Sequence, residues 1–122
     1  MIFLLYLVAV LMISAGVNHF INPKFYAAYM PSFFPKPLAN IVAGIVEIAI
    51  GLLLFLPATR SWAGLAFMVL MVIFLPLHIW DAFKSKPAIG SKAIAFVRLA
   101  LQLVLIYYGW YIWLAYAAPS VT

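Results

Sequence analysis

The sequence contains no cysteine and only two acidic residues, Glu47 and Asp81. Without cysteine the chain has no thiol nucleophile, no disulfide relay and no thiolate ligand for a metal or an iron–sulfur cluster. No phosphate-binding loop, nucleophile elbow or paired-carboxylate hydrolase site is present either. The sequence therefore contains no complete catalytic motif, and whether the chain is an enzyme stays open.

Charged residues make up only 7% of the 122 residues, whereas 70% are hydrophobic, and the mean hydropathy is +1.22. A water-soluble core of this size cannot hide so much apolar surface, so the bilayer must be the solvent. Backbone groups that face lipid must be hydrogen-bonded within their own segment, so apolar runs of about 20 residues are expected to be helices. We predict an all-α, polytopic membrane protein.

Four apolar runs fill the chain, at about residues 2–19, 37–57, 61–83 and 93–116. They predict one domain over residues 1–122, a four-transmembrane-helix bundle without an appended soluble domain. The first run lacks a basic segment before it, so we expect a retained helix rather than a cleaved signal. Asn22 as cap and Pro23 at the first helical position predict a short interfacial helix from about Pro23 to Met30. Aromatic residues in and after this helix are expected at headgroup depth, namely Phe25, Tyr26, Tyr29, Phe33 and Phe34.

The basic residues indicate the topology. Four spans put both termini on one side of the membrane, with Arg60, and five lysines on the other side: Lys24, Lys36, Lys84, Lys86 and Lys92. By the positive-inside rule we expect the lysine-rich loops to be cytoplasmic and both termini on the opposite side of a bacterial inner membrane. Scattered basic residues of this kind do not indicate a nucleic-acid partner.

Polar residues inside the spans each need a physical reason, because a charge there costs at least about 2.5 to 3.5 kcal/mol. Helical steps of three and four place each of them on a stripe with small residues, which marks the bundle interior. Following the chain direction, the ionisable members map to the half nearest the lysine-rich loops. The predicted buried polar cluster, or ligand-binding site, consists of His19, Asn40, Glu47, His78, Asp81, Arg98 and Gln102.

Glu47 and Arg98 are expected to form an ion pair. At about 1.5 Å per residue, Glu47 would lie ~15 Å and Arg98 ~9 Å into the membrane, and the long arginine side chain can bridge the difference. Asn40 and Gln102 would supply further hydrogen bonds. Two interpretations stay open: a structural clamp that fixes helix register, or a polar floor to an apolar pocket for a lipophilic head group such as a quinone.

The two histidines allow a bis-histidine haem, although interfacial hydrogen bonding is the favoured interpretation. His78 and Asp81 are three residues apart, so the carboxylate would orient the imidazole or cap the span. No two-histidine-plus-carboxylate motif predicts a metal site. Pro76, inside the third span, is expected to kink it or to free a carbonyl.

Three stretches, AGVNHFINPKFYAAYMPSFFPKP, VAGIVEIAIGLLLFLPATRSWAG and FLPLHIWDAFK, together resemble the DoxX-like superfamily of small four-helix membrane proteins. The resemblance covers nearly the whole chain and implies a quinone-linked role. Four residues also resemble those of the animal nicotinic-receptor assembly chaperone, whose long hydrophilic tail is missing here: Glu47, His78, Asp81 and Arg98.

Three functions are therefore expected as alternatives. The first is an accessory subunit that binds a lipophilic small molecule or a partner helix, the second is a quinone-linked redox component, and the third is an assembly factor for other membrane proteins. Small residues outside the inward stripes also leave a homodimer open.

Overall fold

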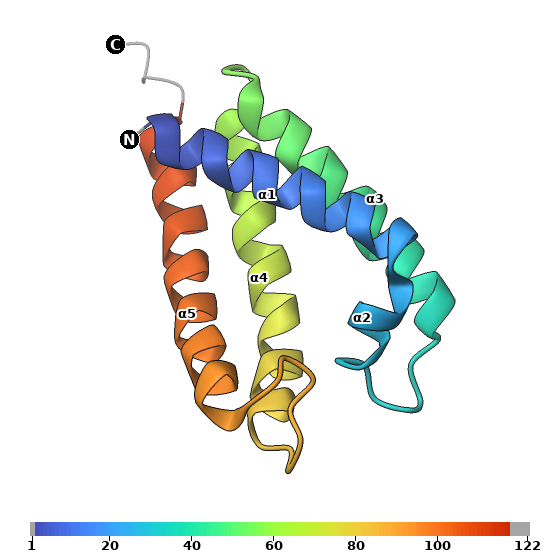
Figure 1. Ribbon diagram of the computed structural model, residues 1–122. Helices are drawn as coiled ribbons and strands as arrows, with labels where there is room; N and C mark the ends of the chain where they lie inside the picture. Colours follow the sequence, from blue (N-terminus) through green and yellow to red (C-terminus); the bar gives the residue numbers. More distant parts are fainter. Residues whose placement is uncertain (1, 118–122) are drawn as a thin grey trace.

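The protein consists of four long helices and one short helix, as a computed structural model shows for residues 2–117 (Figure 1). No strand occurs among these described residues. Each long helix is long and apolar enough to cross a membrane, so the chain is an all-α membrane protein. The helices are α1 (Ile2–Ile21), α2 (Pro23–Ala27), α3 (Lys36–Phe55), α4 (Arg60–Ala82) and α5 (Lys92–Ala115).

Local chemistry explains most of the helix ends. Proline stands in the first turn of α2 and of α3, where its missing N–H costs no helical hydrogen bond. Ser91 caps α5 by accepting a hydrogen bond from the backbone N–H of Ile94 at 3.2 Å. Two details of the predicted interfacial helix are wrong, because it ends at Ala27 and the Asn22 side chain makes no capping hydrogen bond.

Glycines hold the long helices together in two pairs, α1 with α3 and α4 with α5. A Cβ added to Gly16 would lie 2.8 Å from the carbonyl oxygen of Gly44, and one added to Gly109 would lie 2.8 Å from the backbone nitrogen of Met68. Backbones therefore touch within each pair, which only small residues permit. The expectation that the small residues of the stripes allow close approach is confirmed at these positions.

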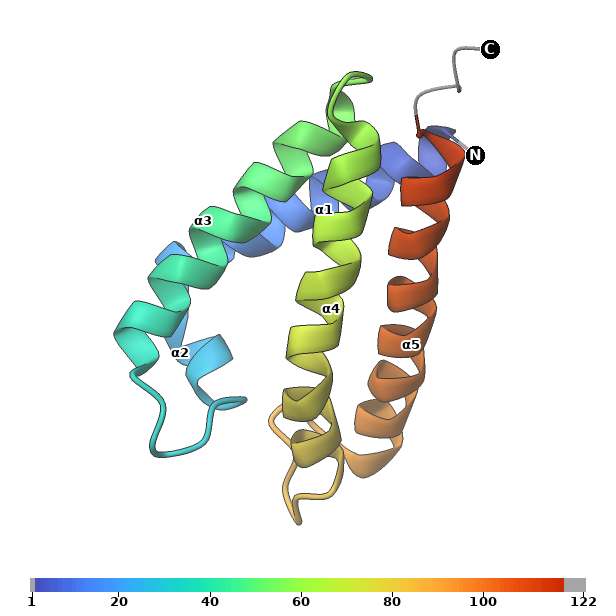
Figure 2. The same ribbon diagram turned by 180° about the vertical axis from the view of Figure 1, so that it is seen from behind.

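The two pairs diverge like the sides of a wedge. They are joined by contacts between α3 and α4, whereas no Cα atom of α1 lies within 8 Å of one in α4 or α5. Figures 1 and 2 show the pairs close together at the turn between α3 and α4 and apart at the other end, where α2 lies between them. Large apolar side chains, Leu5, Leu54, Phe67 and Ile112, fill the buried core.

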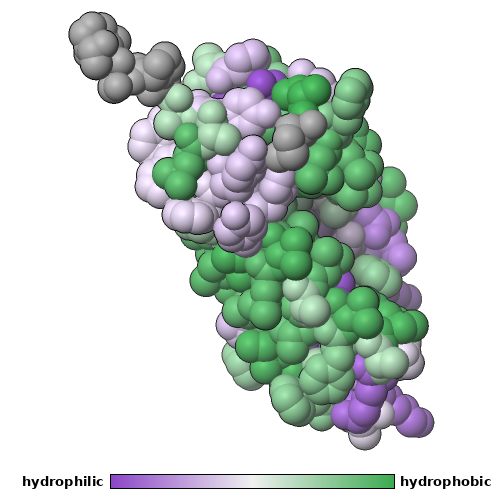
Figure 3. Space-filling view, turned by 90° about the vertical axis from the view of Figure 1, so that its left-hand side faces the viewer, coloured by the Kyte–Doolittle hydropathy of each residue, from purple (hydrophilic) through white to green (hydrophobic). Residues whose placement is uncertain are grey.

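The surface agrees with a membrane setting. Figure 3 shows that hydrophobic residues cover most of the middle of the face in view, with the most hydrophilic residues along its right-hand edge and at the lower end. The loops that follow α1 and α4 share that lower end, and the start of α1 and the end of α5 lie at the upper one (Figure 1). The predicted grouping of the lysine-rich loops at one end of the bundle is therefore confirmed.

Candidate ligand cavity between the helix pairs

A cavity of about 600 Å³ occupies the wedge between the two helix pairs. All four long helices contribute to its walls, and α2 and the loop after it form its cover on the side of the lysine-rich loops. Most of the lining is apolar, with side chains such as Met12, Phe67, Phe74 and Leu105. The polar residues of the lining are His19, Tyr26, Tyr29, Glu47, His78 and Arg98.

The wall formed by α1 and α3 carries a buried polar network. His19 Nε2 lies 2.5 Å from Glu47 Oε2, and His19 Nδ1 lies 2.8 Å from Asn40 Oδ1. Asn40 Nδ2 donates to the carbonyl oxygen of Pro23 at 3.3 Å, which makes Oδ1 the acceptor toward the ring. All three side chains are buried.

This network determines where its protons are. Since Asn40 Oδ1 accepts, His19 Nδ1 carries a hydrogen. Two acceptors cannot face each other at 2.5 Å, so the pair holds a second proton, on His19 Nε2 or on the Glu47 carboxylate. Whether that proton sits on nitrogen or on oxygen, the His19–Glu47 pair has zero net charge.

The cover of the cavity is attached to this wall through Tyr26. Its ring stacks on the His19 ring with a centroid separation of 3.6 Å, and its hydroxyl donates to the carbonyl oxygen of Ala15 at 3.2 Å. The same hydroxyl accepts from Asn18 Nδ2 at 3.1 Å. Burial raises the pKa of the Tyr26 hydroxyl by more than the hydrogen bond from Asn18 lowers it, so the hydroxyl remains a neutral donor. Four of the aromatic residues expected at headgroup depth, Phe25, Tyr26, Tyr29 and Phe34, line the cavity.

The wall formed by α4 and α5 carries a different arrangement. Arg98 Nη1 donates to Gln102 Oε1 at 2.8 Å, and Gln102 Nε2 donates to the carbonyl oxygen of Met71 at 2.7 Å. Gln102 is completely buried, so it is a fixed acceptor for the guanidinium. His78 lies nearby on α4, with its ring edge to face against Tyr29 at a centroid distance of 5.7 Å.

The predicted ion pair between Glu47 and Arg98 does not form. No carboxylate of the described residues lies within 4.0 Å of Arg98, and Glu47 pairs with His19 instead. Both residues do line the same cavity, as the pocket interpretation required. They stand on opposite helix pairs, which diverge, whereas His19 and Glu47 stand on helices whose backbones touch.

Asp81 belongs to the loop rather than to the cavity. Its Oδ1 accepts from the backbone N–H of Ala88 at 2.7 Å and lies 3.2 Å from Lys84 Nζ. Lys84 Nζ also donates to the carbonyl oxygen of Ala28 at 3.0 Å, which ties the α4–α5 loop to the segment after α2. Of the two roles expected for Asp81, a hydrogen bond that orients His78 is not formed among the described residues, because Oδ1 bonds the segment that follows α4.

The structure disagrees with the bis-histidine haem interpretation. Both ring nitrogens of His19 are engaged, one by Asn40 and one by Glu47, so neither offers a lone pair to iron. Within residues 2–117 no group of three or more histidine, aspartate or glutamate side chains is placed to hold a metal ion.

Arg60, which the sequence marks only as a charge between two spans, is a structural residue. It is 6% exposed, and it donates to the carbonyl oxygens of Leu54 at 2.9 Å and Phe55 at 3.0 Å. Its guanidinium also lies over the rings of Tyr6 and Tyr116, at 5.8 and 5.1 Å. Arg60 therefore supplies hydrogen bonds to the free carbonyl groups at the end of α3. It also joins three segments at the narrow end of the wedge. This role could have been predicted from the sequence, because Arg60 follows Pro57, where a helix must end with free carbonyl groups.

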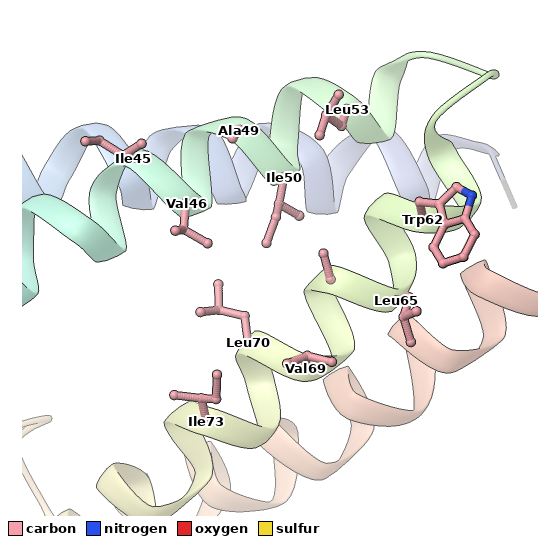
Figure 4. Close-up of a pocket in the computed structure, with 11 residues that line it drawn as sticks. Ile45, Val46, Ala49, Ile50, Leu53, Trp62, Leu65, Val69, Leu70 and Ile73 are labelled. Carbon is pink, nitrogen blue, oxygen red and sulfur yellow. The ribbon is translucent and has the colours of Figure 1, made fainter.

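A second hollow, of about 530 Å³, lies between α3 and α4 on the outside of the molecule. Figure 4 shows its aliphatic side chains, such as Ile45, Val46 and Ile73, with Trp62 at one end. This outer groove carries no ionisable residue. It is suited to contact with acyl chains, and it provides a matched apolar control for the cavity.

Comparison with known proteins gives one family. A model described as a domain of unknown function (DUF8561) matches residues 8–113, a range that contains every residue of the cavity lining. No curated protein and no solved structure matches the chain. The resemblance to DoxX-like proteins therefore stays a prediction.

Proposed function

The chain belongs to the DUF8561 family, and we propose that it is a small accessory membrane protein that binds one lipophilic molecule between its helix pairs. The observation that supports this function is the cavity itself. Its volume of about 600 Å³ lies in the range of small-molecule sites, roughly 300 to 1,000 Å³. Its lining combines apolar walls with a few convergent polar groups, which is the usual composition of such sites.

The ligand reaches the cavity from the bilayer, on the side between α1 and α5. These two helices do not approach each other within 8 Å between Cα atoms, and both contribute to the lining. Leu11 of α1 lines the cavity while its side chain is 56% exposed on the surface. A lipid-soluble molecule can therefore pass from the acyl-chain region without crossing a polar barrier.

The orientation that we propose for the protein in the membrane is based on the positions of its lysines. The two loops that share one end of the bundle carry Lys24, Lys84 and Lys86, and Lys36 and Lys92 begin the helices that follow. By the positive-inside rule this end faces the cytoplasm of a bacterial inner membrane, and both termini lie on the opposite side. The polar half of the cavity then belongs to the cytoplasmic leaflet.

A quinone is the second candidate ligand. The specific observation in its favour is that nitrogen and hydroxyl groups stand on the α4–α5 wall and on the cover of the cavity, at His78, Arg98 and Tyr29. Such groups can donate to the two carbonyl oxygens of a quinone ring. The resemblance to DoxX-like proteins implies the same ligand. No observation favours the assembly-factor hypothesis, which stays a prediction.

The test compares two alanines of α3. Ala43 lines the cavity, whereas Ala49 lines the outer groove (Figure 4). The variants Ala43→Phe and Ala49→Phe add the same side chain to the same helix, but only the first fills the cavity. Native mass spectrometry and solvent extraction of the purified proteins would measure the bound lipophilic molecules, including quinones.

We expect wild type and Ala49→Phe to retain the same molecule and Ala43→Phe to lose it. A quinone among the extracted molecules would support the second candidate. Equal retention by all three proteins, or no retained molecule in any of them, would overturn the proposed function.

A further inference from the structure

The charges around the cavity do not balance. The chain has two acidic side chains, and each is already neutralised: Glu47 by His19 and Asp81 by Lys84. The His19–Glu47 pair has no net charge, and Arg98 always carries one positive charge. No acidic side chain of this protein is therefore free to neutralise the arginine that lines the cavity.

Arg98 has hydrogen-bond capacity to spare. A guanidinium carries five N–H donors in a rigid plane whose geometry matches a carboxylate or a phosphate. In the described structure one of its nitrogens, Nη1, is used, by Gln102 Oε1. Its other nitrogens are not among the buried atoms that lack a hydrogen-bond partner, so they remain accessible. These donors are available to a molecule in the cavity.

The guanidinium is directed toward the interior of the membrane. Gln102 lies one helical turn after Arg98 in α5, farther from the lysine-rich loops, and it is fixed by its bond to the Met71 carbonyl. An arginine that reached for the headgroups of bulk lipid would extend the other way along the helix. Gln102 therefore acts as a positioning residue, which holds the charge against the cavity.

We infer that the ligand is an amphiphile with an oxyanion head, a carboxylate or a phosphate, on one apolar chain, and that Arg98 binds this head. This inference rests on the proposed function, because it names the chemistry of the molecule in the same cavity. The head lies between Arg98 and His78, and the chain extends past Leu105 and Met71 toward Phe67. A volume of about 600 Å³ suits one such chain.

The experiment measures binding to the full-length protein in nanodiscs of zwitterionic phosphatidylcholine. The probes share one palmitoyl-length chain and differ in the head: palmitate, lysophosphatidic acid and uncharged hexadecanol. The proteins are wild type, Arg98→Gln, Ala43→Phe and a charge control, Lys86→Gln, since Lys86 is exposed in the α4–α5 loop. A thermal unfolding curve for each protein checks that it is folded.

We expect Arg98→Gln to bind the anionic probes about 10- to 100-fold more weakly, the loss typical of a charge-assisted hydrogen bond. Its affinity for hexadecanol should be unchanged, and Lys86→Gln should bind every probe as wild type does. Stronger binding of palmitate would identify a carboxylate head, and stronger binding of lysophosphatidic acid a phosphate head. Either result supports the inference.

Two results would overturn it in distinguishable ways. If wild type and Arg98→Gln bind all three probes equally while Ala43→Phe binds none, the ligand head is not anionic but the proposed cavity function stands. If Ala43→Phe binds palmitate like wild type while Arg98→Gln does not, the anion sits at the membrane surface, and the inference and the cavity function both fail.

Discussion

The two helix pairs enclose one cavity but treat buried charge in opposite ways. The α1–α3 pair neutralises its buried carboxylate internally, because Glu47 lies at ion-pair distance from His19, which also contacts Asn40. The α4–α5 pair places Arg98 against a neutral amide, and no carboxylate of the described residues pairs with its charge. Both pairs are built on the same contact between backbones at glycines. The difference in charge therefore does not follow from the packing, and it locates the ligand-binding capacity on the α4–α5 wall.

The comparison predicts which polar residue matters most for stability. Replacing His19 with leucine leaves the Glu47 carboxylate buried without a partner, which should lower the free energy of unfolding by about 3 to 5 kcal/mol. Thermal or denaturant unfolding of the purified variant in detergent measures this loss. It is the largest effect that we expect from a single substitution in the cavity.

A double variant provides the control for that effect. His19→Leu combined with Glu47→Leu removes both partners, so no buried charge remains and the protein should be more stable than His19→Leu alone. If the two substitutions simply add their losses, the pair is not the interaction that stabilises the α1–α3 wall.

The glycine contacts of the two pairs should respond to alanine in different degrees. A Cβ at Gly109 meets the backbone of Met68 at 2.8 Å, whereas a Cβ at Gly44 meets the tip of the Phe20 ring at 2.5 Å and the backbone oxygen of Gly16 at 3.0 Å. The ring of Phe20 is half exposed and can turn away, but a helix backbone can only separate. Gly109→Ala should therefore cost about 1 to 3 kcal/mol.

Gly44→Ala should cost less than about 1 kcal/mol, because alanine also favours the helix over glycine. Unfolding midpoints of the two variants, measured side by side, give the comparison. Equal losses, or a larger loss for Gly44→Ala, would show that the contact of α1 with α3 is as rigid as that of α4 with α5.

The helices themselves were readily predicted from the sequence. The length of an apolar run is set directly by the thickness of the bilayer, so the four predicted spans agree with the helices to within a few residues. Their arrangement was harder to predict. A stripe of small and polar residues shows which side of a helix faces inward, but it does not show which neighbour it meets. The wedge shape depends on that choice of partners.

The same limit explains the error in the candidate site. Depth and helical face were estimated for each residue separately, and both quantities were compatible with a bond between Glu47 and Arg98. His19 satisfied them equally, and it stands on the helix that packs directly against α3. Four of the predicted polar residues, His19, Glu47, His78 and Arg98, line the cavity, whereas Asn40, Asp81 and Gln102 are not part of its lining. The cavity-lining position of Tyr26 and Tyr29 was not predicted, because aromatic residues near a loop were interpreted only as a membrane-interface belt.

Arg98→Gln should have the smallest effect on the free energy of unfolding. Its contrast with His19→Leu therefore distinguishes the roles of the two walls most clearly. The substitution removes one hydrogen bond to Gln102 but also removes an unneutralised charge from the membrane interior, and the new amide can itself reach Gln102 one turn away. The free energy of unfolding should change by less than about 1 kcal/mol. Detergent unfolding measured beside His19→Leu is the direct check. A loss as large as that of His19→Leu would mean that Arg98 has a structural counter-charge after all, and the α4–α5 wall would then resemble the α1–α3 wall instead of carrying spare binding capacity.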